Sequence, residues 1–255
     1  MEHTFEAVEM KLAEADFFLD KLAEEQSISI ANFYFSAFVT AARSVTFTLQ
    51  AVMSRVSGFA EWYAAWQAKM KEDSICRFFV TYRNDVQKVG EMALTTGTAV
   101  HGEGKKLKAV HFFGRSIDTG KEIRLNEQFG RALRRSMRQN SASEQDAVEL
   151  SSRYMRQIVI LVADCLSKFA VLIDPEVLFT EAGLAANGRT VEDVEEDLGF
   201  PRGWTSIPGA SVEKRLELLR VGRQRSRVHA LVEKYGIKLT ANAERHGAGA
   251  DAHPI

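Results

Sequence analysis

Hydrophobic side chains recur at helical spacing through the first 90 residues, and this pattern restricts the fold more than any other feature of the sequence. Over residues 4–25 they form one stripe, which predicts an amphipathic helix. Residues 29–55 are apolar nearly all round, so we expect that helix to lie inside a bundle with partners on several sides. Two more helices are predicted, one after Gly58 and one from Asp73 to near Gly90. Short connections then predict an antiparallel four-helix bundle.

The remaining chain is also predicted to be mainly helical. Residues 91–104 are rich in Gly and Thr and predict a loop, and residues 107–113 and 121–125 predict a small β-hairpin. A long helix is expected over residues 144–173, followed by short helices at 191–198, 212–221 and 225–235. The predicted organisation is a helical bundle at 1–92, a loop and hairpin at 93–125, a helical C-terminal region at 126–240, and a flexible tail at 241–255.

Charge is strongly segregated along the chain, although the net charge is only −1. Residues 1–27 hold eight acids and two bases, and residues 174–200 hold eight acids and one base. Residues 101–140 hold ten bases and four acids, and residues 201–240 hold nine bases and three acids. Two interpretations stay open: the basic stretches form a surface patch, or they pair with the acidic ones.

Several classes of protein are disfavoured by the sequence. Cys76 and Cys165 lie on apolar helical patterns, which predicts buried thiols in a reduced compartment. The acidic N-terminus is unlike a signal peptide, and Asp164 and Lys168 interrupt the longest apolar run, 158–173. We therefore expect a cytoplasmic protein that does not bind a membrane. The six histidines show no paired metal spacing, so no metal or cofactor is predicted.

A run of arginines over residues 126–140 is a candidate nucleic-acid-binding segment. If the run is helical, several of its guanidinium groups share one face, and arginine suits bidentate contacts with phosphate. The alternative is a solvated face balanced by the acidic N-terminal helix. With one arginine just before the run, the candidates are Arg124, Arg131, Arg134, Arg135 and Arg138.

The stretch FFVTYRNDVQKVGE, residues 78–91, raises a second candidate site. Its apolar residues predict an amphipathic helix, yet Arg83 and Asn84 place two strong hydrogen-bonding side chains at the edge of the apolar face. A solvated boundary is one explanation, and a binding site is the other.

The stretch YRNDVQK, on the last helix of the predicted bundle, resembles the higher eukaryotes and prokaryotes nucleotide-binding (HEPN) superfamily. The motif of that family is an Arg, a polar residue that is usually Asn, and a His a few residues later, in an all-helical fold. The segments AARSVTFTLQ and GFAEWYAAW also look like uncharacterised bacterial proteins of that kind. The sequence departs from the motif at residue 88, where Lys88 stands in place of the His.

The resemblance implies a function as well as a fold. Many such proteins are metal-independent RNases of toxin–antitoxin and antiphage systems, and they form homodimers in which two motifs face each other. By that resemblance Arg83 would hold the scissile phosphate, Asn84 would orient the site, and Lys88 would occupy the place of the catalytic His. An unperturbed Lys is charged at neutral pH and is a poor general base.

Two functions are therefore expected from the sequence. The first is a HEPN-like protein that binds RNA or a nucleotide phosphate, with a metal-independent endoribonuclease as its catalytic form and an antitoxin or another defence protein as a partner. The second is a non-catalytic helical interaction protein or dimerisation module, in which Arg83 and Asn84 fix a helix–helix contact. The segregated arginines favour the first function, and Lys88 favours the second.

Overall fold

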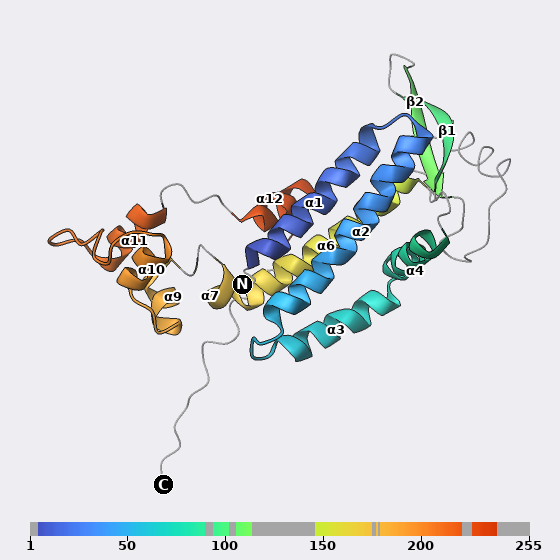
Figure 1. The fold of residues 1–255 in the computed structure, drawn as a ribbon. Helices are drawn as coiled ribbons and strands as arrows, with labels where there is room; N and C mark the ends of the chain where they lie inside the picture. Colours follow the sequence, from blue (N-terminus) through green and yellow to red (C-terminus); the bar gives the residue numbers. More distant parts are fainter. Residues whose placement is uncertain are drawn as a thin grey trace, which may run out of the picture.

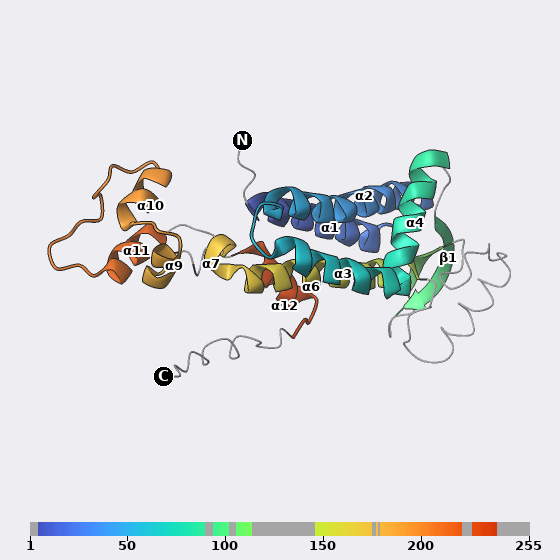
Figure 2. The same cartoon turned by 90° about the horizontal axis from the view of Figure 1, so that it is seen from below.

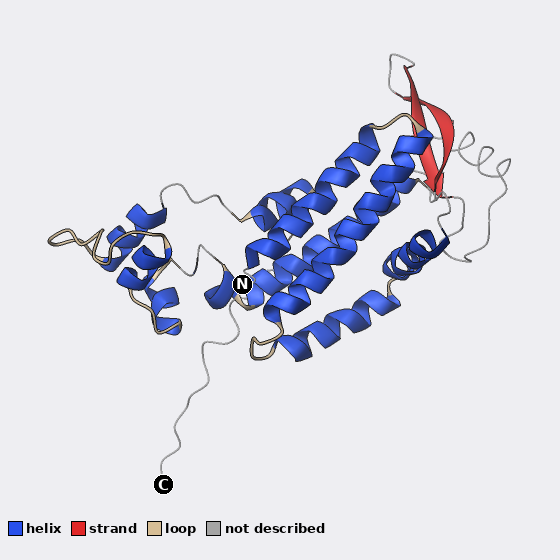
Figure 3. Cartoon of the chain, in the orientation of Figure 1, coloured by secondary structure: helices blue, strands red, loops and turns tan. Residues whose placement is uncertain are grey.

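The protein is described here from a computed structural model of the chain. The structure describes residues 5–89, 94–101, 106–113, 146–174, 177, 179–220 and 226–238 (Figure 1). Helices dominate these residues, and the strands form one small hairpin at an end of the bundle (Figure 3). The mainly α-helical fold with an N-terminal bundle, a β-hairpin and a helical C-terminal region is thus as the sequence predicts.

The N-terminal helices follow the predicted pattern closely. They are α1 (Phe5–Glu24), α2 (Ile28–Met53), α3 (Phe59–Glu72) and α4 (Ser74–Val89). The hydrophobic stripe of α1 is buried along its whole length. Asp73 caps α4 as predicted, because its carboxylate accepts a hydrogen bond from the backbone N–H of Cys76 at 2.8 Å. Both cysteines are buried and unpaired, and burial raises the pKa of each thiol to about 12.

The β-hairpin exists, but the loop predicted over residues 91–104 was wrong, because residues 94–101 form one of its strands. Strand β2 (Lys106–Phe113) pairs antiparallel with β1 (Leu94–His101), a segment that the sequence predicted as loop. The predicted second strand, 121–125, lies outside the described residues. Thr-rich β1 is joined to the bundle by Asn32, whose side chain accepts from the Leu94 N–H at 3.0 Å and donates to the Leu94 carbonyl at 3.4 Å.

The hydrophobic core of the bundle extends beyond residue 92. Helix α6 (Ala147–Lys168) lies alongside α1 and α2, and its buried residues belong to the same core as theirs (Figures 1 and 2). Asp146 caps α6 by accepting from the backbone N–H groups of Val148 and Glu149. Helix α12 (Arg227–Lys234) returns to α1 and α6 and completes this core. The bundle therefore includes α6 and α12, which belong to the predicted C-terminal region. The domain boundaries expected from the sequence remain a prediction.

A second, smaller hydrophobic core lies among the short C-terminal helices. Helix α7 (Ala170–Ile173) follows α6 directly. After it come α9 (Glu181–Ala186), α10 (Val191–Asp197) and α11 (Val212–Arg220), which we call the C-terminal module. The sequence predicted α10, α11 and α12 and missed α9, which is only six residues long. The module lies beyond one end of the bundle, away from the β-hairpin (Figures 1 and 2).

Candidate functional site

Helix α4 is held by a cluster of aromatic rings that fixes the position of Arg83 and Asn84. Phe79 stacks on Tyr154 of α6 with ring centroids 4.5 Å apart and planes nearly parallel at 3°. Phe78 contacts Phe113 of the hairpin edge-on, with centroids 4.9 Å apart. Burial raises the pKa of Tyr154, so its hydroxyl stays neutral inside the core. The N-terminal half of α4 thus packs on both the β-hairpin and α6.

The side chain of Arg83 extends from α4 toward α2. Its guanidinium carbon lies 5.9 Å from the ring centroid of Phe47. The guanidinium carbon of Arg43, on α2, lies 4.4 Å from the same centroid. Two arginines from different helices therefore meet at one aromatic ring, and Phe47 remains 48% exposed. We call Arg43, Phe47 and Arg83 the arginine–phenylalanine site.

The described residues provide no counter-ion for these two arginines. Among the side chains that the structure describes, no carboxylate lies within ion-pair distance of either guanidinium. Arg43 donates one hydrogen bond, to the hydroxyl of Thr46 at 3.2 Å. The buried Nε of Arg83 has no hydrogen-bond partner. A guanidinium offers five N–H donors, so the described partners leave donors at this site unused.

One face of α2, beside this site, is open. Helix α2 contacts α1, α4, α6 and β1, as the apolar pattern predicted, but Ile30, Phe33 and Phe47 are exposed on the remaining face, Phe33 to 70%. Small residues, Ala37 and Ser44, lie between the two phenylalanines at helical spacing. The predicted burial is correct for the opposite face, where Phe35 and Phe38 are fully enclosed.

The predicted site residues separate into three groups. Arg83 is half-buried and Asn84 is exposed, so only Arg83 takes part in the contact with Phe47. Lys88 belongs to α4, but its side chain is outside what the structure describes. The arginines at 124, 131, 134, 135 and 138 lie outside the described residues.

Sequence reasoning missed Arg43, although the sequence contains a signal for it. Arg43 is the only charged residue among the 26 residues of α2. A lone charge in a long apolar helix needs either a partner or a function, because burying a charged group without one is costly. That signal would have pointed to Arg43 before the structure did.

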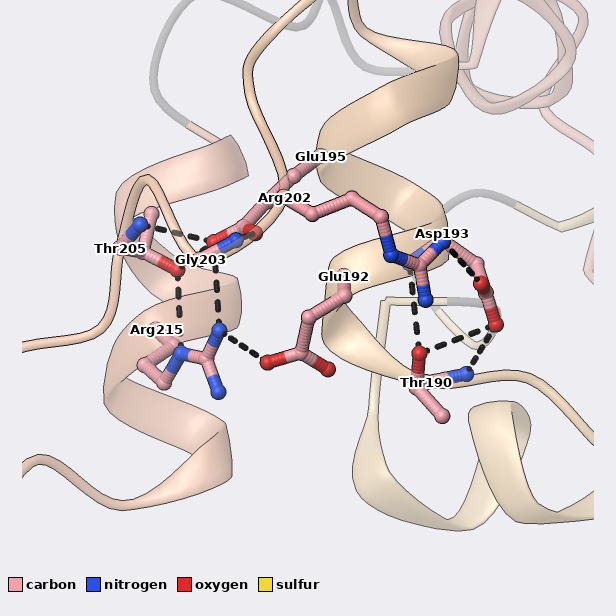
Figure 4. Close-up of polar contacts among 8 residues, drawn as sticks. All are labelled: Thr190, Glu192, Asp193, Glu195, Arg202, Gly203, Thr205 and Arg215. Carbon is pink, nitrogen blue, oxygen red and sulfur yellow. Dashed lines mark hydrogen bonds and ion pairs between the residues drawn. The ribbon is translucent and has the colours of Figure 1, made fainter.

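A second group of charged residues, in the C-terminal module, is fully paired. Arg215 of α11 contacts Glu192 at 2.6 Å and Glu195 at 3.2 Å, and Arg202 contacts Asp193 at 2.8 Å (Figure 4). Arg202 also contacts Glu196 at 2.9 Å. An acidic run of this kind is typical of a solvated helix face with acids in the first turn. Glu195 departs from that pattern, because it is completely buried.

Glu195 stays ionised although it is enclosed. Burial alone would raise the pKa of its carboxyl. Hydrogen bonds from Thr205 and Gly203 and the contact with Arg215 outweigh that effect and lower the pKa to about 2. Asp193 forms a capping box with Thr190, and together with Arg202 this lowers the pKa of Asp193 to about 2. These acids therefore hold the module together and are engaged within it.

Among the described residues, no group of three or more His, Cys, Asp or Glu side chains could hold a metal ion. Within the same part, the structure has no helix with the length and hydropathy needed to span a bilayer.

Comparison with known proteins gives one result. Residues 6–101, which contain α1 to α4 and β1, match the family model described as bacteriophage lambda protein ea47. No curated protein and no solved structure matches the chain. The matched segment contains Arg43, Phe47 and Arg83, so the chain is similar to a phage protein family over the region that holds the candidate site.

Proposed function

We propose that the protein binds RNA or a nucleotide phosphate at the arginine–phenylalanine site. One observation carries the proposal: two guanidinium groups from α2 and α4 meet at an exposed ring, and neither is paired with a described carboxylate. Guanidinium groups bind phosphate by bidentate hydrogen bonds, and an exposed aromatic ring stacks on nucleobases. A charged site that lacks an internal counter-ion favours an external anion.

The proposal keeps the HEPN-like interpretation of the motif and extends it. Arg83 holds the phosphate together with Arg43, and Asn84 lies next to it on the exposed side of α4. The protein acts as a homodimer in the cytoplasm, in a toxin–antitoxin or antiphage system with a partner protein. The similarity of residues 6–101 to a phage protein family supports a setting at the phage–host interface. Catalysis is weak because Lys88 replaces the titrating His.

A second function is favoured by a different observation. The exposed face of α2, with Ile30 and Phe33, is apolar and open. Exposed apolar surface of this kind is typical of protein–protein contacts. On this alternative the protein is a non-catalytic dimerisation or interaction module, and Arg43 and Arg83 position Phe47 at a protein interface.

Binding of a labelled single-stranded RNA, measured by fluorescence anisotropy at several salt concentrations, separates the two functions. The wild type should bind with a salt-dependent affinity, because each neutralised phosphate releases counter-ions. Arg43→Ala and Arg83→Ala should each weaken binding and reduce the salt slope by about one. Arg153→Ala is the matched control, because Arg153 is exposed on α6, and it should bind like the wild type. RNA binding that neither site variant changes would reject the site.

Cleavage is tested separately on the same RNA in excess chelator. We expect little or no cleavage by the wild type and more by Lys88→His, because His titrates near neutral pH. Cleavage by the wild type that survives Arg83→Ala would place the chemistry elsewhere. Absence of both binding and cleavage, together with a dimer that Phe33→Ala dissociates, would support the interaction module instead.

A further inference from the structure

The loop between α10 and α11, residues 200–209, exposes large apolar side chains at the surface of the C-terminal module. Trp204 is 63% exposed and Ile207 is 55% exposed. The rings of Phe200 and Trp204 stack with centroids 5.7 Å apart and an angle of 11° between their planes. We call Phe200, Trp204 and Ile207 the aromatic platform. Large side chains so exposed are costly for solubility, and in soluble proteins they commonly mark contact sites.

The backbone that carries the platform is held rigidly. The buried carboxylate of Glu195 accepts hydrogen bonds from the backbone N–H groups of Gly203 and Thr205, and from the hydroxyl of Thr205. Gly203 has a φ of +82°, a conformation that side chains rarely adopt, so the tight turn depends on glycine. Further turns are closed by the N–H of Trp204 on the Pro201 carbonyl at 3.0 Å and by the N–H of Ser206 on the Gly203 carbonyl at 2.9 Å.

This construction differs from that of a spacer between two helices. A buried, ionised carboxylate is expensive unless it is fully hydrogen-bonded, and here it serves to fix a loop whose largest side chains face solvent. A rigid aromatic side chain loses little conformational entropy on binding, and Trp is over-represented among the residues that dominate binding energy. The platform therefore has the properties of a pre-formed anchor.

The charge around the platform indicates the kind of partner. Residues 179–219 carry eight acidic and four basic side chains, so the module is negatively charged. Arg202, the cation within the loop, is already paired with Asp193 and Glu196. Anionic lipid and nucleic acid are repelled by such a surface, whereas a basic protein segment is attracted. Exposed aromatic rings add cation–π contacts with Arg or Lys side chains.

We propose that the aromatic platform is a docking site for a basic segment of a partner protein. An apolar side chain of that segment packs on Trp204 and Ile207. Its Arg or Lys side chains lie over the stacked rings, attracted by the net negative charge of the module. This surface is separate from the arginine–phenylalanine site, which lies on α2 and α4 of the bundle. One chain thus carries a cationic site at the bundle and an anionic, aromatic one at the module.

The test uses the full chain and a short fluorescein-labelled peptide composed of Arg, Leu and Ser. The wild type should bind this peptide and should not bind a counterpart in which Glu replaces every Arg. Trp204→Ala should weaken binding at least tenfold. Leu218→Ala is the matched control, because Leu218 is an exposed apolar residue of α11 in the same module, and it should bind as the wild type does. Equal affinity of Trp204→Ala and the wild type would overturn the proposal.

Lipid vesicles and RNA are tested as alternative ligands by tryptophan fluorescence. The signal of interest is the part of the emission that Trp204→Ala lacks. Vesicles of phosphatidylglycerol and phosphatidylcholine should leave this emission unchanged, and so should single-stranded RNA. A blue shift with vesicles would identify the platform as a membrane contact, and quenching by RNA would identify it as a nucleic-acid site. Either result would overturn the proposal.

Discussion

The arginine–phenylalanine site and the paired arginines of the C-terminal module use the same side chain in opposite ways. Arg215 and Arg202 each contact two carboxylates of α10, and these ion pairs stabilise the C-terminal module. Arg43 and Arg83 meet at Phe47 with no described carboxylate beside them. The difference shows that a basic residue is a candidate for anion binding when no neighbouring carboxylate pairs with it. A count of basic residues along the chain does not reveal this.

The strongest way to sharpen this contrast is to remove the buried carboxylate. Glu195→Ala leaves two backbone N–H groups and the Thr205 hydroxyl without their acceptor, and Arg215 keeps only Glu192 as an ion-pair partner. Removal of one member of a buried ion pair costs about 3–5 kcal/mol. The module should lose protection against hydrogen exchange over residues 191–219, while α2 should be unaffected. Glu196→Gln is the control, because Glu196 is exposed and its pair with Arg202 contributes little. Equal protection in both variants would show that Glu195 is not essential to the module.

Acid should weaken the module before it affects the arginine–phenylalanine site. The pKa of Glu195 is lowered to about 2 in the folded chain from its ordinary value of 4.5, so the stabilisation is complete above pH 4.5 and is lost as the pH falls toward 2. Asp193 acts in the same direction, since its pKa is also lowered to about 2. Hydrogen exchange over residues 191–219, followed from pH 5 to pH 2, measures this loss. Protection that stays constant over that range would contradict the account.

An intermediate effect is expected at the ring that both arginines share. Phe47→Ala should lower RNA affinity by about 1–3 kcal/mol, the usual contribution of one base stacked on an aromatic side chain. Phe33→Ala removes a still more exposed ring from the same helix face, about four helical turns away, and should change RNA affinity much less. The comparison is made by anisotropy at a single salt concentration. Equal losses in the two variants would point to a general apolar surface and away from a site at Phe47.

The smallest effect is expected from the exposed pairs of the module. Arg202→Ala removes two contacts, with Asp193 and Glu196, but all three side chains are substantially exposed. Exposed ion pairs contribute about 0–1 kcal/mol, so thermal unfolding should shift little. RNA affinity should stay unchanged, because this arginine is already paired. A clear loss of RNA binding in Arg202→Ala would break the distinction between the two kinds of arginine.

The helices were predictable because each depends on local pattern. The buried stripe of α1, the Asp73 cap of α4 and the helices α10 to α12 all follow from spacing and capping within a few residues. The hairpin partner was missed because β1 is rich in Thr and Gly, and its position depends on Asn32, some 60 residues earlier in the chain. No local pattern records such a contact.

The candidate site was half predictable for the same reason. Arg83 stood out as a polar residue on the edge of an apolar face, and the resemblance to a known motif added to that signal. Arg43 lies 40 residues away, and only the packing of α4 on α2 brings the two guanidinium groups to Phe47. The burial of Glu195 could not be predicted, because it is the one buried acid of the five in α10 and the sequence shows only an acidic run.

The most direct test of the central claim is a titration of the chain with a short single-stranded RNA, followed through the arginine Nε–Hε resonances in an NMR spectrum. The Nε of Arg83 is buried and has no hydrogen-bond partner, and that of Arg215 donates to the Thr205 hydroxyl at 3.1 Å. If Arg43 and Arg83 bind phosphate, their resonances should shift in proportion to RNA bound, while that of Arg215 should stay in place. RNA binding that leaves the resonances of Arg43 and Arg83 unmoved would contradict the account.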